Sequence, residues 1–139
     1  MKKFVLITAL ALAPALASAE TFEDVFEMNR GMYGPGHTFT WEGKEYTTDH
    51  EEEREAAVDA TQANAESLIA KAKAKNKEVA ALGFEWKLTR DILKQAETAV
   101  QEGEYREALT LAAQAKYHAR MGIRQHAYSQ SHWHLSVPE

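Results

Sequence analysis

The chain contains no cysteine among its 139 residues. Without a thiol it cannot form a disulfide, carry haem through a Cys-x-x-Cys-His motif or be lipidated on a cysteine. It also lacks a glycine-rich phosphate loop, a His-Glu-x-x-His metal motif and a Gly-x-Ser-x-Gly nucleophile motif. The sequence therefore predicts that the protein is not an enzyme, and it indicates no cofactor.

Large apolar side chains are scarce once the first 19 residues are set aside. Residues 20–139 contain 7 Leu, 3 Ile, 5 Val and 4 Phe, or 19 of 120 residues, which is below the level of about 20% associated with weak cores. Eighteen alanines replace them, and alanine favours helix while burying little area. We expect a thin helical core that is marginally stable alone and gains stability from a partner.

Residues 1–19 have the pattern of a secretory signal peptide. Two lysines precede an apolar stretch from Phe4 to Ala17, and a small-x-small cleavage site ends at Ala19. The stretch is too short for a membrane-spanning helix of about 20 residues, although an uncleaved anchor is the alternative. Its removal leaves 14 basic and 21 acidic residues, a net charge of −7, which disfavours nucleic acid as a partner. We expect a periplasmic protein without a membrane span.

Residues 20–48 are expected to form an N-terminal arm that consists of a short helix and a β-hairpin. A capping box at residues 21–24 marks the start of the helix. Two strand-forming tetrads flank Glu42-Gly43, and a two-residue turn there places Phe39 opposite Tyr46. A two-stranded hairpin is marginal in water, so we expect it to pack on a helix or on a partner.

Residues 49–126 are expected to form a small antiparallel three-helix bundle, so the fold class is all-α. A capping box at Asp49-x-x-Glu52 begins one long helix that no glycine or proline interrupts before Leu82, with its first acidic residues in water. Gly83 and Gly103 suit the left-handed conformation that ends a helix. Because the connection at Gly103 is short, the last two helices are expected to form a C-terminal helical hairpin.

Two segments in the C-terminal half resemble a known family. They are Ala-Leu-Gly-Phe-Glu-Trp-Lys-Leu-Thr-Arg-Asp-Ile-Leu-Lys-Gln-Ala-Glu at residues 81–97, and Gly103-x-Tyr105-x-x-Ala108-x-x-Leu111-Ala112-x-x-Ala115. Across residues 70–126 the chain resembles the SoxXA-binding protein (SoxK) family. That resemblance implies a small exported protein without a redox cofactor of its own. It also implies association with SoxXA, the c-type cytochrome of the thiosulfate-oxidising Sox system.

Five side chains are candidates for binding a partner. Phe84 and Trp86 lie at a helix junction, Tyr105 begins the last helix, and aromatic side chains concentrate binding energy at interfaces. The alternative is that Trp86 is simply the largest core residue of a thin bundle. Lys71 and Lys75 share one side of the long helix and form a candidate docking strip for an acidic partner. A solvated helix face has the same pattern, which is the alternative for these lysines.

Histidines are concentrated near the C-terminus, where residues 127–139 are expected to form a flexible His-rich tail. His118, His126, His132 and His134 lie within the last 22 residues. Imidazole binds copper, zinc and iron, so a metal or non-covalent haem site built from these four residues is an alternative. Their spacing matches no known ligand motif. The sequence therefore predicts no metal site.

Together these features predict an exported accessory protein that docks onto another protein. The resemblance implies that this protein partner is a c-type cytochrome of sulfur-compound oxidation. A periplasmic metal- or haem-binding protein and a generic helical-hairpin module in cell-envelope assembly are the two alternatives. The sequence does not define the stoichiometry, the oligomeric state or the role of the arm at residues 20–48.

Overall fold

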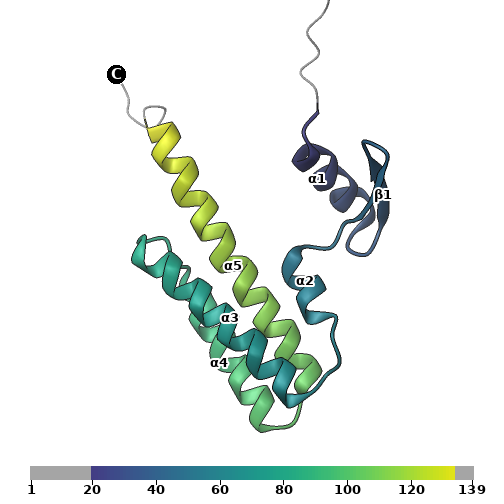
Figure 1. Cartoon of the computed structure of the whole chain (residues 1–139). Coiled ribbons are helices and arrows are strands. Elements are labelled where there is room, and N and C mark those ends of the chain that lie inside the picture. Colours follow the sequence, from purple (N-terminus) through teal and green to yellow (C-terminus); the bar gives the residue numbers. More distant parts are fainter. Residues whose placement is uncertain (1–19, 134–139) are drawn as a thin grey trace, which may run out of the picture.

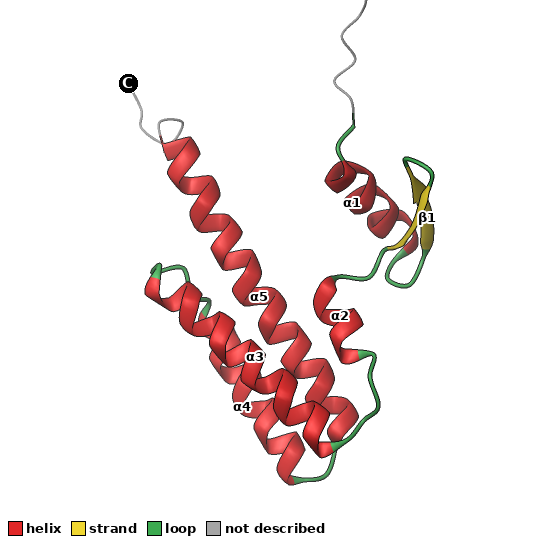
Figure 2. Ribbon diagram, viewed as in Figure 1, coloured by secondary structure: helices red, strands yellow, loops and turns green. Residues whose placement is uncertain are grey.

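A computed structural model describes residues 20–133, so the expected signal peptide lies outside the described residues. The chain is mostly helical, with one small antiparallel hairpin (Figures 1 and 2). Its elements in order are α1 (Phe22–Tyr33), β1 (Thr38–Trp41), β2 (Lys44–Thr47), α2 (Glu51–Ala56), α3 (Gln62–Ala81), α4 (Lys87–Gln101) and α5 (Tyr105–His132). Over residues 20–133, none of the helices combines the length and the hydrophobicity needed to cross a membrane.

The N-terminal arm forms as the sequence predicts. The capping box at residues 21–24 is present at the start of α1. In the hairpin Phe39 pairs with Tyr46, and the turn residues Glu42 and Gly43 have φ angles of 46° and 78°. Two successive left-handed residues suit the right-handed twist of the strands, which is why this two-residue turn closes the hairpin.

Helices α3, α4 and α5 pack against one another and contain most of the buried residues. Leu109 is the largest fully buried side chain. Seven alanines of residues 20–133 are fully buried as well: Ala65, Ala72, Ala96, Ala108, Ala112, Ala115 and Ala119. Because alanine has the smallest side chain after glycine, the helices approach one another closely but bury little apolar area for each residue. The expected alanine-rich core is therefore present.

The predicted glycine helix ends are confirmed. Gly83 follows α3 with a φ angle of 76°, and the N–H of Phe84 donates to the carbonyl oxygen of Val79 at 3.2 Å. This bond spans the turn and satisfies a carbonyl at the end of the helix. Gly103 ends α4 in the same way, with a φ angle of 78°. A helix therefore ends and a turn begins at each of these two glycines.

The prediction of one uninterrupted helix over residues 49–82 is wrong. The chain forms α2 and α3, which are separated by an exposed connection at residues 57–61. Arg106 of α5 donates to the carbonyl oxygens of Ala56 and Val58, each at 2.6 Å, and a side-chain N-cap begins α3. A distant arginine thus satisfies the carbonyls at the end of α2, so the helix ends without glycine or proline.

Two helix boundaries also differ from those expected. The residue that caps α2 is His50 instead of Asp49, because the N–H of His50 donates to Oε2 of Glu53 at 2.7 Å. Helix α5 continues to His132, so the expected flexible tail is helical in residues 127–132. Residues 134–139 lie outside the described residues.

Candidate functional site

The connection between α3 and α4 places two predicted binding residues against one face of α5. The Phe84 ring meets the His126 ring edge-on, with centroids 5.1 Å apart. The indole Nε1 of Trp86 donates to Oε1 of Gln125 at 3.3 Å, and the Trp86 ring centroid lies 5.2 Å from that of His118. We call these five residues, Phe84, Trp86, His118, Gln125 and His126, the turn surface.

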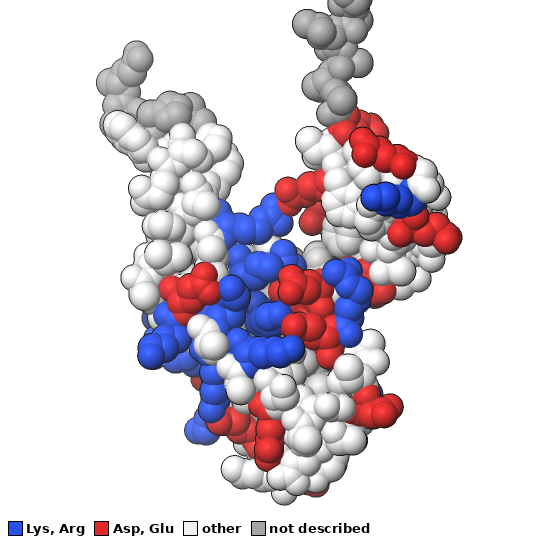
Figure 3. Space-filling view, viewed as in Figure 1, with Lys and Arg blue, Asp and Glu red and all other residues white. Residues whose placement is uncertain are grey.

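Several apolar side chains around this connection are exposed. Trp86 is 40% exposed, so it is not a buried core residue. Leu82 and Leu88, which flank the connection in the sequence, are 38% and 55% exposed. Beyond Arg124 the described part of α5 carries no lysine, arginine, aspartate or glutamate, and this end of the helix is the uncharged upper-left lobe in Figure 3.

Gly122 allows α5 to approach the connection closely. A Cβ atom at this position would lie 2.7 Å from the carbonyl oxygen of Phe84 and 2.7 Å from Cγ2 of Val79. The carbonyl belongs to the backbone and cannot rotate aside, so any larger residue must push the connection away from α5. The sequence signal for this contact is a glycine inside an otherwise continuous helix.

His118 is the most enclosed polar group of the turn surface. Its Nδ1 atom is buried and has no hydrogen-bond partner among the described residues. Burial lowers the pKa of His118 below its ordinary value of 6.5, because an imidazolium loses its hydration there. The His118 ring is therefore mainly neutral at pH 7.

The structure does not bring Tyr105 into the turn surface. Tyr105 is the first residue of α5 and packs against the apolar core together with Val100 and Leu111. It precedes His118 by 13 residues, which corresponds to about 20 Å along the helix axis. Any partner that uses Tyr105 must therefore contact a separate part of the molecule.

The two candidate docking lysines are both paired with acids of the same chain. Nζ of Lys71 lies 3.3 Å from Oε1 of Glu55 in α2. Nζ of Lys75 lies 2.8 Å from Oε2 of Glu78, one turn further along α3. The structure therefore does not present them as an unpaired basic strip, and their role toward a partner stays a prediction.

The candidate histidine ligands do not converge. His118 and His126 contact aromatic rings of the turn surface, whereas the His132 ring stacks on Tyr128 with centroids 3.9 Å apart. His134 lies outside the described residues. Within residues 20–133, no group of three or more histidine, aspartate or glutamate side chains could hold a metal ion.

A row of ion pairs that we did not predict from the sequence joins the N-terminal region to α5. Lys116, Arg120 and Arg124 are four residues apart, so they lie along one face of α5. Figure 3 shows lysine and arginine side chains gathered beside aspartate and glutamate side chains at the centre of the molecule. The pairs that form this charged seam are Lys116 with Glu51 and Glu55, Arg120 with Glu52, and Arg124 with Glu23. The four-residue spacing is the sequence signal that could have revealed it.

The expectation that the first acidic residues of α2 lie in water is wrong for Glu52. Its side chain is only 1% exposed, and Nε and Nη2 of Arg120 donate to its two carboxylate oxygens at 2.7 and 3.0 Å. Burial raises the pKa of Glu52, but the hydrogen bonds from Arg120, a backbone hydrogen bond and the charges of Arg120 and Lys116 together hold that pKa below its ordinary value of 4.5. The buried pair therefore stays ionised at neutral pH.

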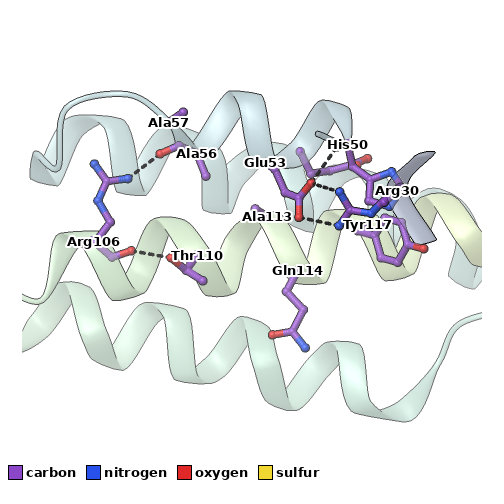
Figure 4. A pocket seen from close by; sticks show the side chains of 11 residues that line it. Arg30, His50, Glu53, Ala56, Ala57, Arg106, Thr110, Ala113, Gln114 and Tyr117 are labelled. Carbon is purple, nitrogen blue, oxygen red and sulfur yellow. Dashed lines mark hydrogen bonds and ion pairs between the residues drawn. The ribbon is translucent and has the colours of Figure 1, made fainter. Parts of the chain in front are cut away.

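An open pocket of about 600 Å³ lies beside the seam, between α2 and α5 (Figure 4). At one end Nη1 and Nη2 of Arg30 donate to the two carboxylate oxygens of Glu53, both at 2.8 Å. The His50 ring lies there too, 4.6 Å from the Tyr117 ring, and burial together with the nearby Arg30 lowers its pKa. Because the Arg30 guanidinium and the Glu53 carboxylate bind each other, they join α1 to α2 at this end of the pocket and leave neither group free for a ligand.

Two arrangements thus stand out in the described part of the chain. The turn surface exposes apolar area toward solvent, whereas the charged seam satisfies its charges within the chain. Comparison with protein-family models, with curated proteins and with solved structures finds no match to this chain. Its function is therefore inferred from its own residues and their geometry.

Proposed function

We propose that the protein is an exported accessory protein that docks through the turn surface onto another exported protein. The resemblance of residues 70–126 to the SoxXA-binding family suggests the class of that partner, a c-type cytochrome of thiosulfate oxidation. The signal-peptide pattern of residues 1–19 supports export to the periplasm. In this proposal the protein performs no reaction of its own and needs no cofactor.

The scaffold in this proposal is an antiparallel three-helix bundle of α3, α4 and α5, with α4 and α5 as its C-terminal hairpin. Short connections at Gly83 and Gly103 favour antiparallel neighbours. Closely approaching alanine faces leave little internal room for an indole ring. Trp86 therefore lies at the surface of the bundle, where a partner can cover it.

The exposed but oriented side chain of Trp86 is the observation that carries the proposal. Although 40% exposed, its indole is held by the hydrogen bond to Gln125 and by contact with the His118 ring. An aromatic ring that is already oriented loses little conformational entropy on binding. Such residues supply a large share of the binding energy at protein interfaces.

Recovery of the partner from cells tests the proposal directly. An affinity-tagged chain purified from the native periplasm should bring a c-type cytochrome in stoichiometric amount, visible as a haem absorption band. Trp86→Ala should weaken binding to that cytochrome by about tenfold or more, since an interface hot spot exceeds the 1.4 kcal/mol that a tenfold change requires. Tyr33→Ala is the matched control, because Tyr33 is 56% exposed on α1, away from the turn surface in Figure 1.

Helix content measured by circular dichroism separates loss of folding from loss of binding. Retained helix content with lost cytochrome binding in Trp86→Ala, but not in Tyr33→Ala, is the expected result. Recovery of envelope-assembly proteins without a cytochrome would contradict the cytochrome assignment and favour the generic module. Stoichiometric metal or haem on the purified chain would favour the metal- or haem-binding alternative.

A further inference from the structure

One face of α5 is basic, and the N-terminal region of the same chain covers it. Lys116, Arg120 and Arg124 form this face, and Lys71 of α3 lies beside it because Lys71 and Lys116 both bind Glu55. We call these four residues the basic stripe. Arg120 and Gly122 are two residues apart and so lie on opposite sides of α5. The basic stripe is therefore a different face of the helix from the turn surface.

Helix α2 occupies the basic stripe mainly through charge. Its buried residues are Glu52 and Ala56, so its only buried apolar side chain is a single methyl group. Ion pairs and the hydrogen bonds that Arg106 donates to backbone carbonyls add to this contact, as does the ring of the N-cap residue His50, which lies 4.6 Å from that of Tyr117. A six-residue helix is far shorter than the roughly 12 residues that an isolated helix needs in water. Its helical state therefore depends on contact with the stripe.

The surroundings of α2 allow it to leave the stripe with the loss of one contribution to the core, the methyl group of Ala56. The connection at residues 57–61 is exposed along its whole length. On the other side, the paired contacts between Arg30 and Glu53 join α2 to α1, and α1 itself has no buried residue. The arm and α2 can thus move together about the connection while α3, α4 and α5 stay packed.

We propose that the basic stripe is a second docking surface, for an acidic helical segment of another protein, and that α2 occupies this surface in the free chain. The residues by which α2 contacts the stripe indicate which residues a partner helix needs. A matching helix presents carboxylates spaced like Glu51, Glu52 and Glu55, followed by a small apolar residue in the place of Ala56. This inference goes beyond the proposed function, and it holds whether or not the turn surface binds a cytochrome.

Competition within the chain sets the conditions for such binding. A segment tethered by a short linker has an effective concentration on the order of millimolar. A partner segment that makes the same contacts must therefore be present above that concentration or bind the basic stripe more tightly than α2 does. It can also bind a chain in which the contact of α2 with the stripe is weakened. The structure thus predicts that weakening α2 increases the affinity for an acidic segment supplied from outside.

A labelled peptide with the sequence of residues 49–61 tests this prediction by fluorescence anisotropy at low salt. The chain that carries Glu52→Gln and Glu55→Gln should bind the peptide at least about tenfold more tightly than the unsubstituted chain. Adding Arg120→Gln to that chain should reduce the affinity about tenfold, because it removes a charge-assisted pair of hydrogen bonds. A peptide of the same composition in scrambled order is the control and should bind weakly to all three chains.

Equal affinity of the peptide for the first two chains, or equal affinity for the ordered and scrambled peptides, would overturn the proposal. If the chain with Glu52→Gln and Glu55→Gln loses helix content, the proposal is tested on the unsubstituted chain instead. Millimolar ordered peptide should then accelerate hydrogen–deuterium exchange in α2 and leave α3, α4 and α5 protected, and unchanged exchange in α2 would overturn the proposal. A stable dimer that exchanges α2 between copies would also overturn it, because the stripe would then serve self-association.

Discussion

The N-terminal region, formed by α1, β1, β2 and α2, is attached to α5 by other forces than those that hold α3, α4 and α5 together. Helices α3, α4 and α5 have a buried apolar core of alanine and leucine. The N-terminal region contains an aromatic cluster around Phe39 and is attached to α5 by ion pairs such as those of Arg120 and Arg124. Salt screens exposed charges but strengthens or leaves unchanged the burial of apolar area. The comparison implies that the two regions lose their structure under different conditions.

The contact at Gly122 offers the largest change on the core side of this comparison. Gly122→Ala should destabilise α3, α4 and α5 by about 1–3 kcal/mol, because the new Cβ collides with the backbone of Phe84. Gly31→Ala in α1 is the matched control, since a Cβ there has no atom within 4 Å and alanine favours helix. Urea unfolding followed by circular dichroism measures both. Equal midpoints for the two variants would show that α5 does not approach the connection as closely as described.

Arg120 offers the corresponding change on the charged side. Arg120→Gln leaves the buried Glu52 carboxylate without its cation, at a local cost of about 1–3 kcal/mol. Hydrogen–deuterium exchange should therefore become faster in α1 and α2, with little change in α3 and α4. Arg90→Gln is the control, because Arg90 is 68% exposed in its pair with Glu85 and exposed pairs contribute little. An effect of Arg120→Gln spread evenly over all helices would contradict the division into two regions.

Acid provides a smaller and graded change. Burial and the charge of Arg30 lower the pKa of His50. The neutral form of His50 therefore stabilises the folded state fully above the ordinary pKa of 6.5, and this stabilisation is lost as the pH falls below that value. The pKa values of Glu52 and Glu55 are lowered by Arg120 and Lys116 in spite of burial. Their contribution is complete above about pH 4.5 and is lost as the pH falls through their lowered pKa values.

Only the second of these two acid steps affects the two regions differently. Burial lowers the pKa of His118 in the core, so the core also loses stability as the pH falls below 6.5. The second step, below pH 4.5, should therefore distinguish the regions by releasing α1 and α2 first. Exchange rates measured from pH 7 to pH 3.5, corrected for the intrinsic effect of pH, test this order. Earlier loss of protection in α3 than in α2 would contradict it.

The sequence predicted those features that depend on neighbouring residues. The register of Phe39 with Tyr46 follows from a two-residue turn, and the helix ends at Gly83 and Gly103 follow from their left-handed backbone. The end of α2 was not predictable in this way, because it depends on Arg106, which is 50 residues distant in the sequence from Ala56. Local patterns thus define turns and caps, whereas contacts between distant elements decide which helices end early.

The same distinction applies to the candidate site, where local features were predicted and contacts between distant helices were not. The position of Phe84 and Trp86 at a helix junction was predicted, since Gly83 fixes that junction. The pairing of Lys71 with Glu55 and the burial of Glu52 were not predicted, because a run of glutamates at a helix start is usually solvated. The partners of these residues lie on helices whose relative positions the sequence alone did not define.

The salt dependence of exchange tests the central claim, that charge attaches the N-terminal region to α5 whereas apolar burial holds the core. Hydrogen–deuterium exchange of the whole chain is measured at neutral pH at about 0.02 M and 1 M NaCl, where the screening length falls from about 20 Å to about 3 Å. Exchange in α2 and at the α1 contact with α5 should accelerate severalfold or more, while α3, α4 and the first half of α5 stay protected. Unchanged protection of α2 at high salt, or parallel loss in every helix, would contradict the claim.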